Sequence, residues 1–459
     1  MPAIIGALLV FVSEAGHIVP PIVGIGVSLL ALATAFAVRR ELWVVFGGLI
    51  AVAIIPVYWA PVIPKTHEGI FPVLGLCIVL LPTVLSELPE VRLLSIDWLM
   101  GAYVVMRIIG SLVNSSRGAG SALDAVLYAG LPYAVFRVIA LKPAVRRVAA
   151  YSIVVSGVIS SVLAIREYGG SRNPFFNHFP HGLAHAYWIK TDMRFNRTRP
   201  EASFGHADAL GLFLSFSVLL AVTLAWRERS MPRRLLLYAS AGICAQGIAD
   251  TLERGPIIFL LIGLPLVLLI ELRQGELRRL LGALVVVGII LAATSIGTTA
   301  IALRNASVEP GRLNASAQDR YDTIRAMGDP RFFTLLGHNL GDDSTLSVQQ
   351  AIGIETGLGA IENAFMFTYV AYGALAYAAF AAMVVPVARG AFNRRLDLLD
   401  RGWLAIATCS FLLFLSVSFA AQFGHFFWMS LGIAAAALQT AKHDTTAPTG
   451  ETKVLQVAG

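Results

Sequence analysis

The sequence predicts an all-α integral membrane protein that crosses the bilayer many times. Hydrophobic residues make up 57% of the 459 residues and charged residues only 14%. Apolar runs of about 18–22 residues recur along the chain, and a helix of that length crosses a hydrocarbon core of about 30 Å. Because lipid offers the backbone amides no hydrogen-bond partner, these runs are expected to be helices.

The predicted spans follow one another with short connections, apart from two long interruptions. The segment Met1–Val12 is apolar but too short to cross the membrane, and it lacks the basic start of a signal peptide. The expected number of spans is therefore twelve to fourteen. In chain order we expect them near 18–38, 42–60, 70–87, 97–113, 122–141, 149–165, 208–226, 235–250, 256–271, 280–300, 362–388, 403–421 and 425–441.

The orientation of the spans follows from the basic residues in the connections. The opposite short connections hold only Lys65, Arg117 and Arg254, so the basic face is predicted to be cytoplasmic. That face carries Arg39, Arg40, Arg92, Lys142, Arg146, Arg147, Arg227, Arg229, Arg233, Arg234, Arg273, Arg278, Arg279, Arg389, Arg394, Arg395 and Arg401.

This orientation divides the chain into six parts and places both long interruptions outside. Long loops cross the membrane regardless of their charge, so the topology tolerates their arginines. The parts are N-terminal helices (1–165), a basic extracytoplasmic loop (166–207), central helices (208–300), a large extracytoplasmic loop (301–361), C-terminal helices (362–441) and a polar cytoplasmic tail expected to be disordered (442–459).

The first outer loop holds an unusual concentration of charge for its side of the membrane. It contains four histidines and the basic residues Arg166, Arg172, Lys190, Arg194, Arg197 and Arg199. The planar guanidinium fork suits phosphate, and a diphosphate at the outer surface is the natural partner. The loop ends near Ser203, His206 and Asp208, where the next helix is expected to begin and its dipole also favours anions. Binding to lipid headgroups is the alternative interpretation.

Other polar residues leave open questions. Arg107 lies inside a predicted span, where it either serves a function or extends toward the outer interface. His178, His181 and His185 have a spacing that a metal site needs, but Pro180 interrupts a helix there and we favour a surface that contacts sugar or headgroups. The net charge of +7 is attributed to topology and to contacts with membrane lipids, not to nucleic acid. The three cysteines fall inside predicted spans and predict no disulfide framework.

Four segments in order resemble one known family. The first, Arg194–Asp208, reads RFNRTRPEASFGHAD, and the second, Ala249–Gly255, reads ADTLERG. The third combines DRYDTIR (319–325) with LLGHNLG (335–341), and the fourth, Ile361–Gly373, reads IENAFMFTYVAYG. Together they resemble the motifs of the O-antigen polymerase and ligase family of bacterial membrane glycosyltransferases. The resemblance covers about 199–380 and implies a GT-C-like helical fold.

The resemblance implies a reaction and its participants. Such enzymes transfer a glycan from a polyprenyl (undecaprenyl) pyrophosphate donor to an acceptor hydroxyl at the outer face of the inner membrane, without a metal or other cofactor. Arg199, Arg254 and Arg320, with Arg197, are the expected pyrophosphate-binding residues. His206, Asn363, Arg325 and Glu253 are expected to support them. A flippase and a chain-length regulator of the same pathway are the expected protein partners.

The reaction also needs a base that removes a proton from the attacking hydroxyl. The ligase branch of the family usually has histidine at the position of Glu362, so this departure favours a polymerase of exopolysaccharide or O-antigen-like chains. Glu362 and His338 are the two candidates for the base, and Glu253 is a third. The expected function is thus a polysaccharide polymerase with its active site facing the periplasm or exterior. The alternatives are an O-antigen ligase and, from a different class, a lipid-linked oligosaccharide flippase or exporter.

Overall fold

The protein is helical and contains several helices of membrane-spanning length. The computed structural model describes residues 41–56, 70–114, 118–170, 173, 175, 193–194, 197–271, 334–337, 364–414 and 421–446. Within this part of the chain, six helical segments are long and apolar enough to cross a membrane: Pro72–Glu90, Ser95–Val113, Ala122–Ile139, Pro143–Tyr168, Ala207–Arg227 and Ala364–Ala391. This architecture is that of a multi-pass membrane protein.

The described elements are mostly α-helices, with one two-stranded hairpin between α8 and α10. In chain order they are α3 (Glu41–Ile54), α4 (Ile70–Glu87), η3 (Leu88–Glu90), α5 (Ser95–Asn114), α6 (Gly118–Asp124), the π-helix η4 (Ala125–Gly130), α7 (Leu131–Ile139), α8 (Pro143–Tyr168), β1 (Met193–Arg194), β2 (Arg197–Thr198), α10 (Ala207–Arg227), α11 (Met231–Asp250), α12 (Arg254–Glu271), α16 (Ala364–Ala382), α17 (Val384–Ala391), α18 (Leu398–Leu413) and α19 (Ala421–Thr446).

The predicted spans agree with these helices to different degrees. The spans 70–87, 97–113 and 208–226 match α4, α5 and α10 within two residues at each end. In contrast, α3 ends at Ile54 and α18 at Leu413, both earlier than predicted, while α19 continues to Thr446. The spans 18–38 and 280–300 lie outside the described residues. The count of twelve to fourteen therefore stays a prediction.

One predicted span, 362–388, is interrupted. The backbone of Gly373 has φ 87° and ψ 173°, values that break the helix inside α16. Glycine tolerates this conformation because it has no Cβ, whereas other residues are excluded from it. The apolar composition of the segment predicts a continuous helix, so the break is a feature that hydrophobic length alone does not reveal.

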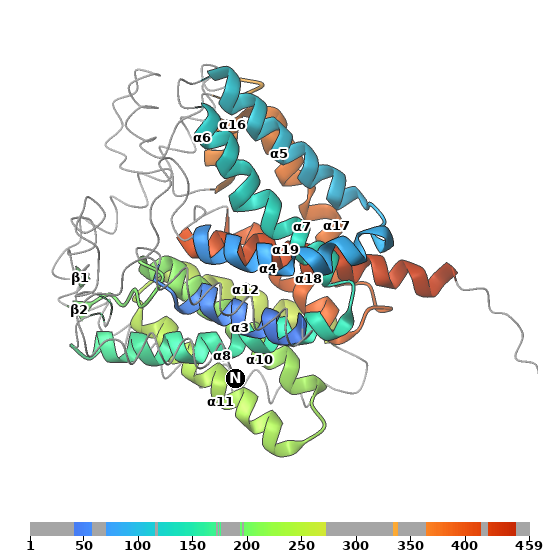
Figure 1. The fold of residues 1–459 in the computed structure, drawn as a ribbon. Coiled ribbons are helices and arrows are strands. Elements are labelled where there is room, and N and C mark those ends of the chain that lie inside the picture. Colours follow the sequence, from blue (N-terminus) through green and yellow to red (C-terminus); the bar gives the residue numbers. More distant parts are fainter. Residues whose placement is uncertain are drawn as a thin grey trace, which may run out of the picture.

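Helix α10 is the centre of one group of helices. It packs against α8, α11, α12, α18 and α19, and α3 packs against α8 (Figure 1). All residues of α10 from Ala209 to Ala225 are buried, as expected for a helix that is apolar all round. A side chain at Gly157 of α8 would overlap Ser217 of α10, and the Ser217 hydroxyl donates a hydrogen bond to the Ile153 carbonyl at 3.1 Å. Small residues thus bring the two helices close together.

A second group consists of α5, α6 and α16, which lie side by side and inclined to the first group (Figure 1). Helix α7 continues the direction of α6 and packs against α19 and α4. Because α19 also contacts α10 and α18, it joins the two groups. Helix α7 therefore reaches the first group both through α19 and through α4, which packs against α3.

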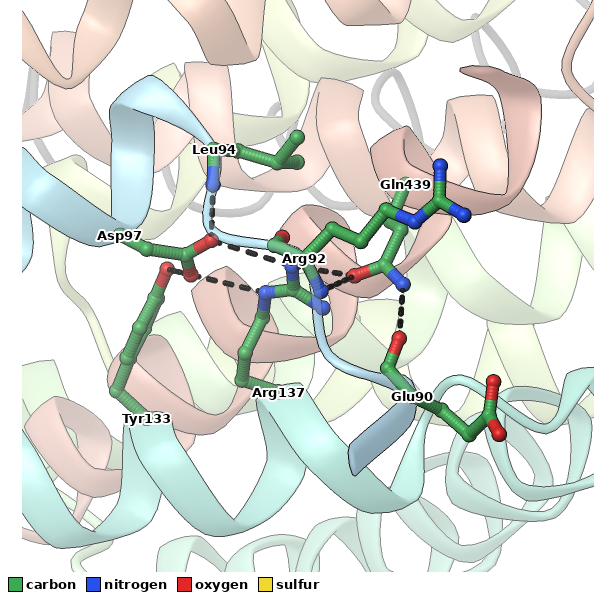
Figure 2. Close-up of polar contacts among 7 residues, drawn as sticks. All are labelled: Glu90, Arg92, Leu94, Asp97, Tyr133, Arg137 and Gln439. Carbon is green, nitrogen blue, oxygen red and sulfur yellow. Dashed lines mark hydrogen bonds and ion pairs between the residues drawn. The ribbon is translucent and has the colours of Figure 1, made fainter. Parts of the chain in front are cut away.

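A buried ionic network fixes this junction (Figure 2). Arg137 of α7 forms two contacts with the Asp97 carboxylate, from Nε at 2.8 Å and from Nη2 at 3.1 Å. Tyr133 donates to the same carboxylate at 2.6 Å, and Arg137 Nη2 donates to Gln439 of α19 at 2.8 Å. Gln439 in turn donates to the carbonyl of Glu90 at 2.7 Å. The network links η3, α5, α7 and α19.

Three further ion pairs lie on the side predicted to be cytoplasmic. The guanidinium of Arg146 binds Asp400 of α18 through Nε at 2.7 Å and Nη2 at 3.0 Å, and both side chains are buried. Lys142 Nζ lies 2.9 Å from carboxylate oxygens of both Glu41 and Glu87. Burial alone would lower the pKa of Lys142, but the hydrogen bonds and attraction of the two carboxylates raise it. Basic residues that were expected to set topology and to contact membrane lipids therefore also join helices.

Candidate functional site

The first candidate site lies where α8 ends and α10 and α12 begin, at helix ends predicted to be extracytoplasmic. We call Glu167, Arg199 and Glu253 the outer cluster. Arg199 follows β2, and Glu253 occupies the turn between α11 and α12. The two side chains form an ion pair and are 15% and 10% exposed. The structure therefore brings together two residues that the sequence assigns to the same site from different motifs.

Glu167 shapes the turn that follows Arg199. It is buried in the last turn of α8, and its Oε2 accepts hydrogen bonds from the backbone N–H of Glu201 at 3.2 Å and of Ala202 at 3.0 Å. The side-chain amide of Asn173 lies 3.4 Å from the same oxygen and donates to the Ala202 carbonyl at 2.9 Å. One carboxylate thus holds the segment after Arg199 against the end of α8.

The two turns that supply the ion pair contain the non-glycine residues with positive φ in the described chain. Ala202 has φ 46° and Leu252 has φ 56°. A left-handed backbone costs an L-residue about 1–2 kcal/mol, so surrounding contacts must hold both turns in shape. For Ala202 these contacts include Glu167, and the neighbouring Ser203 hydroxyl donates to the carbonyl of Ala53 in α3 at 2.5 Å. Strain of this kind often accompanies a functional site.

Helix ends surround the outer cluster. His206 is the N-cap of α10, where its Nδ1 accepts a hydrogen bond from the Asp208 N–H at 3.2 Å, and its side chain is half exposed. The predicted helix start near His206 is confirmed. Arg254 is the first residue of α12, so the unsatisfied N–H groups of that helix start directly after Glu253. Ser215 of α10 donates to the Pro256 carbonyl at 3.2 Å, which holds the start of α12 against α10.

The hairpin before Arg199 brings two arginines to one register position. β1 and β2 are antiparallel, with Met193 opposite Thr198 and Arg194 opposite Arg197. Arg197, which the sequence assigns to the pyrophosphate site, lies two residues before Arg199. It is paired in register with Arg194.

Several predicted site residues are not described by the structure. The positions outside the described residues are Arg320, Arg325, His338, Glu362 and Asn363. Their neighbours do appear: Gly337 precedes His338, and Ala364, which follows Asn363, begins α16 and donates its N–H to the Phe414 carbonyl at 3.0 Å. The roles of these five residues stay predictions.

A second candidate site lies inside the membrane region, among α5, α6 and α16. We call Tyr103, Arg107, Asp124 and Tyr372 the intramembrane cluster. Arg107 is 3% exposed, and its Nη2 lies 3.1 Å from Asp124 and 2.9 Å from the Tyr372 hydroxyl. Its guanidinium carbon lies 4.2 Å from the centre of the Tyr372 ring and 5.5 Å from that of Tyr103. Arg107 is thus held inside the protein and does not extend to the interface.

The depth of this cluster follows from the helix ends. Arg107 and Asp124 lie about two turns from the facing ends of α5 and α6, roughly 10 Å along each axis at about 1.5 Å per residue. Aromatic side chains enclose the cluster: Tyr103 stacks on Trp428 at 5.4 Å, and Tyr128 of η4 contacts the His425 ring edge-on at 4.6 Å. A π-helix often marks a functional position, and an ionisable residue in a membrane span does so by default.

Three members of the intramembrane cluster are absent from the predictions based on sequence. Arg107 stands out as a charged residue inside a predicted span, whereas Asp124, Tyr103 and Tyr372 are not among the predicted site residues. A usable signal exists for Asp124, because it is the single carboxylate of the next predicted span and lies in the outer half of that span, as Arg107 does in its own. No comparable signal identifies Tyr372, which follows 265 positions after Arg107.

Comparison with family models and with curated proteins finds no match for this chain. Within the described residues, no three His, Cys, Asp or Glu side chains are grouped in a way that could hold a metal ion. The histidines at 178, 181 and 185 lie outside that part of the chain. The chemistry of the two clusters is thus defined by arginine, carboxylate and tyrosine groups.

Proposed function

We propose that this protein is a bacterial membrane glycosyltransferase that polymerises oligosaccharide repeat units carried on polyprenyl pyrophosphate. The observation that supports the proposal is the ion pair between Arg199 and Glu253. These residues belong to two separate segments that resemble motifs of the O-antigen polymerase and ligase family. Their contact is what a common site built from both segments requires.

The proposal includes a finer architecture and location. The chain would cross the bacterial inner membrane twelve to fourteen times in a GT-C-like arrangement, with its large extracytoplasmic loop at 301–361. The outer cluster would face the periplasm or exterior, where the lipid-linked glycan donor and the acceptor meet. The distribution of basic residues between the short connections on the two sides of the membrane supports this orientation.

Residues of the outer site would have different roles. Arg254, together with Arg320 and Arg197, would bind the pyrophosphate leaving group. Their positive charges would stabilise the negative charge that develops on it in the transition state. Arg199 would orient these groups while Glu253 holds it, a contact that favours a positioning role for Glu253 over that of base. Glu362 or His338 would remove the proton from the acceptor hydroxyl.

The two alternative functions differ in how they use charge. A flippase needs cationic residues along a path through the membrane. In the described spans, Arg107 and Arg137 are instead neutralised by Asp124 and Asp97. This pairing favours an enzyme with its charge at the outer surface. A ligase would share the pyrophosphate site, and the glutamate at position 362 favours the polymerase.

Replacement of Arg254 tests the proposal. Arg254→Ala should lower the polymerisation rate about 100-fold or more, as the loss of one donor to a developing anion does elsewhere. Cells with this variant should accumulate single repeat units in the outer leaflet, as seen in the length distribution of lipid-linked glycan. A flippase variant would instead trap these units on the cytoplasmic side.

The matched control is Arg166→Ala, because Arg166 is an exposed arginine at the same outer helix ends and has no assigned role in the site. It should leave polymer length unchanged. Polymer of normal length in the Arg254→Ala variant would refute the polymerase function, and repeat units trapped inside would favour the flippase.

A further inference from the structure

A short piece of the large outer loop is inserted into the helix break of α16. The N–H of Ala374 donates to the carbonyl of Thr334 at 2.9 Å, and the N–H of Leu375 lies 3.4 Å from the carbonyl of Leu335. The break at Gly373 deprives the first N–H groups of the following helical segment of partners within the helix. The segment Thr334–Gly337 supplies those partners at a depth where water is scarce.

Three glycines allow this segment to approach so closely. A Cβ at Gly110 of α5 would overlap the carbonyl oxygen of Leu336. A Cβ at Gly337 would overlap the carbonyl of Ala371, and one at Gly373 would overlap the backbone N of Gly337. Gly337 and Gly373 also have φ of 74° and 87°. The segment therefore has one narrowly defined position between α5 and α16.

The intramembrane cluster borders this position on two sides. Tyr372 directly precedes the break, and Arg107 lies one helical turn before Gly110 on α5. Arg107 holds Tyr372 through the 2.9 Å hydrogen bond to its hydroxyl and through the face of its ring. Asp124 compensates the charge of Arg107, which would otherwise be costly at this depth. The ion pair between Arg107 and Asp124 thus holds Tyr372, the residue directly before the break, in position.

We infer that Arg107 and Asp124 are positioning residues that anchor the Thr334–Gly337 segment of the outer loop within the membrane. Through Tyr372 they fix the break in α16, and through the break they fix the segment. The anchoring itself is independent of any enzymatic activity. Its catalytic consequence rests on the proposed function, because His338, a candidate base, follows Gly337 in the sequence.

Labelling of a single cysteine measures the anchoring. Leu336→Cys is suitable because Leu336 is half-buried and the natural cysteines, Cys77, Cys244 and Cys409, are buried. A membrane-impermeant maleimide should react with the introduced cysteine about tenfold faster or more when the hydrogen bond between Arg107 and the Tyr372 hydroxyl is removed. The variants are Tyr372→Phe, which keeps the ring, and the double variant Arg107→Met/Asp124→Leu, which leaves no uncompensated charge. Gly110→Ala should raise the rate by direct overlap.

The matched control removes the other intramembrane pair. Arg137→Met/Asp97→Leu deletes an equally buried ion pair at the opposite end of α5, and it should leave the labelling of position 336 unchanged. Equal increases in both double variants would show general loosening and overturn the positioning role. Unchanged labelling in Tyr372→Phe and Arg107→Met/Asp124→Leu proteins that elute as folded monodisperse particles would also overturn it.

The outcome separates from that of the proposed function. If the cluster variants are labelled faster and the Arg254→Ala variant makes normal polymer, the anchoring is supported and the polymerase function is refuted. Unchanged labelling together with loss of polymer in Arg254→Ala would refute the anchoring and support the polymerase. A combined effect, raised labelling with loss of polymer in Tyr372→Phe, would support both and connect the anchor to the catalytic loop.

Discussion

Removal of the Glu167 carboxylate should destabilise the turn that carries Arg199. In the Glu167→Ala variant, the backbone N–H groups of Glu201 and Ala202 lose the acceptor that lies 3.2 and 3.0 Å away. The consequences for the two donors differ because their surroundings differ. Glu201 is half-buried, so water can replace the carboxylate there, whereas Ala202 is 1% exposed and its N–H would be left without a partner.

The magnitude follows from these contacts. A hydrogen bond contributes about 0.5–1.5 kcal/mol between neutral groups and about 1.5–3 kcal/mol to a charged group, and a buried donor that loses its partner costs about 1–3 kcal/mol. With the Ala202 donor counted in full and the Glu201 donor at a fraction, Glu167→Ala should lower the free energy of unfolding by about 2–4 kcal/mol. Glu167→Gln retains a carbonyl oxygen as acceptor and should cost about 1 kcal/mol.

The free energy of unfolding can be measured by titrating the protein in mixed micelles with dodecyl sulfate. Arg166→Ala is the control, since Arg166 is the exposed neighbour of Glu167, and a surface change of this kind costs about 0.5 kcal/mol or less. A loss below about 1 kcal/mol for Glu167→Ala, or one equal to that of Arg166→Ala, would show that Glu167 does not hold the turn.

Two further predictions concern other contacts, and the same titration checks both. Arg137→Met alone leaves the buried Asp97 carboxylate uncompensated and should cost about 3–5 kcal/mol, while Arg137→Met/Asp97→Leu should recover most of this loss. An equal loss in the single and double variants would contradict this account. Ala202→Gly should change the free energy of unfolding by less than about 1 kcal/mol, because relief of about 1–2 kcal/mol of left-handed strain is offset by the added freedom of the unfolded chain, about 0.5–1 kcal/mol, and by loss of a buried methyl group, about 0.8 kcal/mol. A decrease of about 1.5 kcal/mol or more would show that Ala202 is not strained.

The fold class was predictable because the length and hydrophobicity of the apolar runs define it. The apolar runs that became α4, α5 and α10 are long and bounded by polar residues, so their limits agree within two residues even though Arg107 lies inside α5. The break at Gly373 was not predictable in this way. Glycine occurs widely in membrane helices, and only the approach of the Thr334–Gly337 segment distinguishes this one.

Two members of the outer cluster were predictable from the sequence, but their contact was not. The sequence identifies Arg199 and Glu253 as polar residues in outer connections, yet their ion pair depends on how α8, α10 and α12 pack. The sequence does not distinguish Glu167, because it lies at the very end of an apolar run, where a carboxylate is common. Its importance comes from backbone groups more than thirty positions later in the chain.

The two intramembrane ion pairs have a consequence for how the chain enters the bilayer. Helix α5 carries Asp97 near one end and Arg107 further along, and the next helical segment carries Asp124 and Arg137 in the matching antiparallel order. The two segments therefore form a hairpin in which each charge meets its opposite, and the four charges sum to zero. Such a hairpin can leave the translocation machinery as one neutral unit, and a shift of one turn between its arms would separate both pairs. Charge thus defines the alignment of two apolar helices, which hydrophobicity alone leaves free to slide.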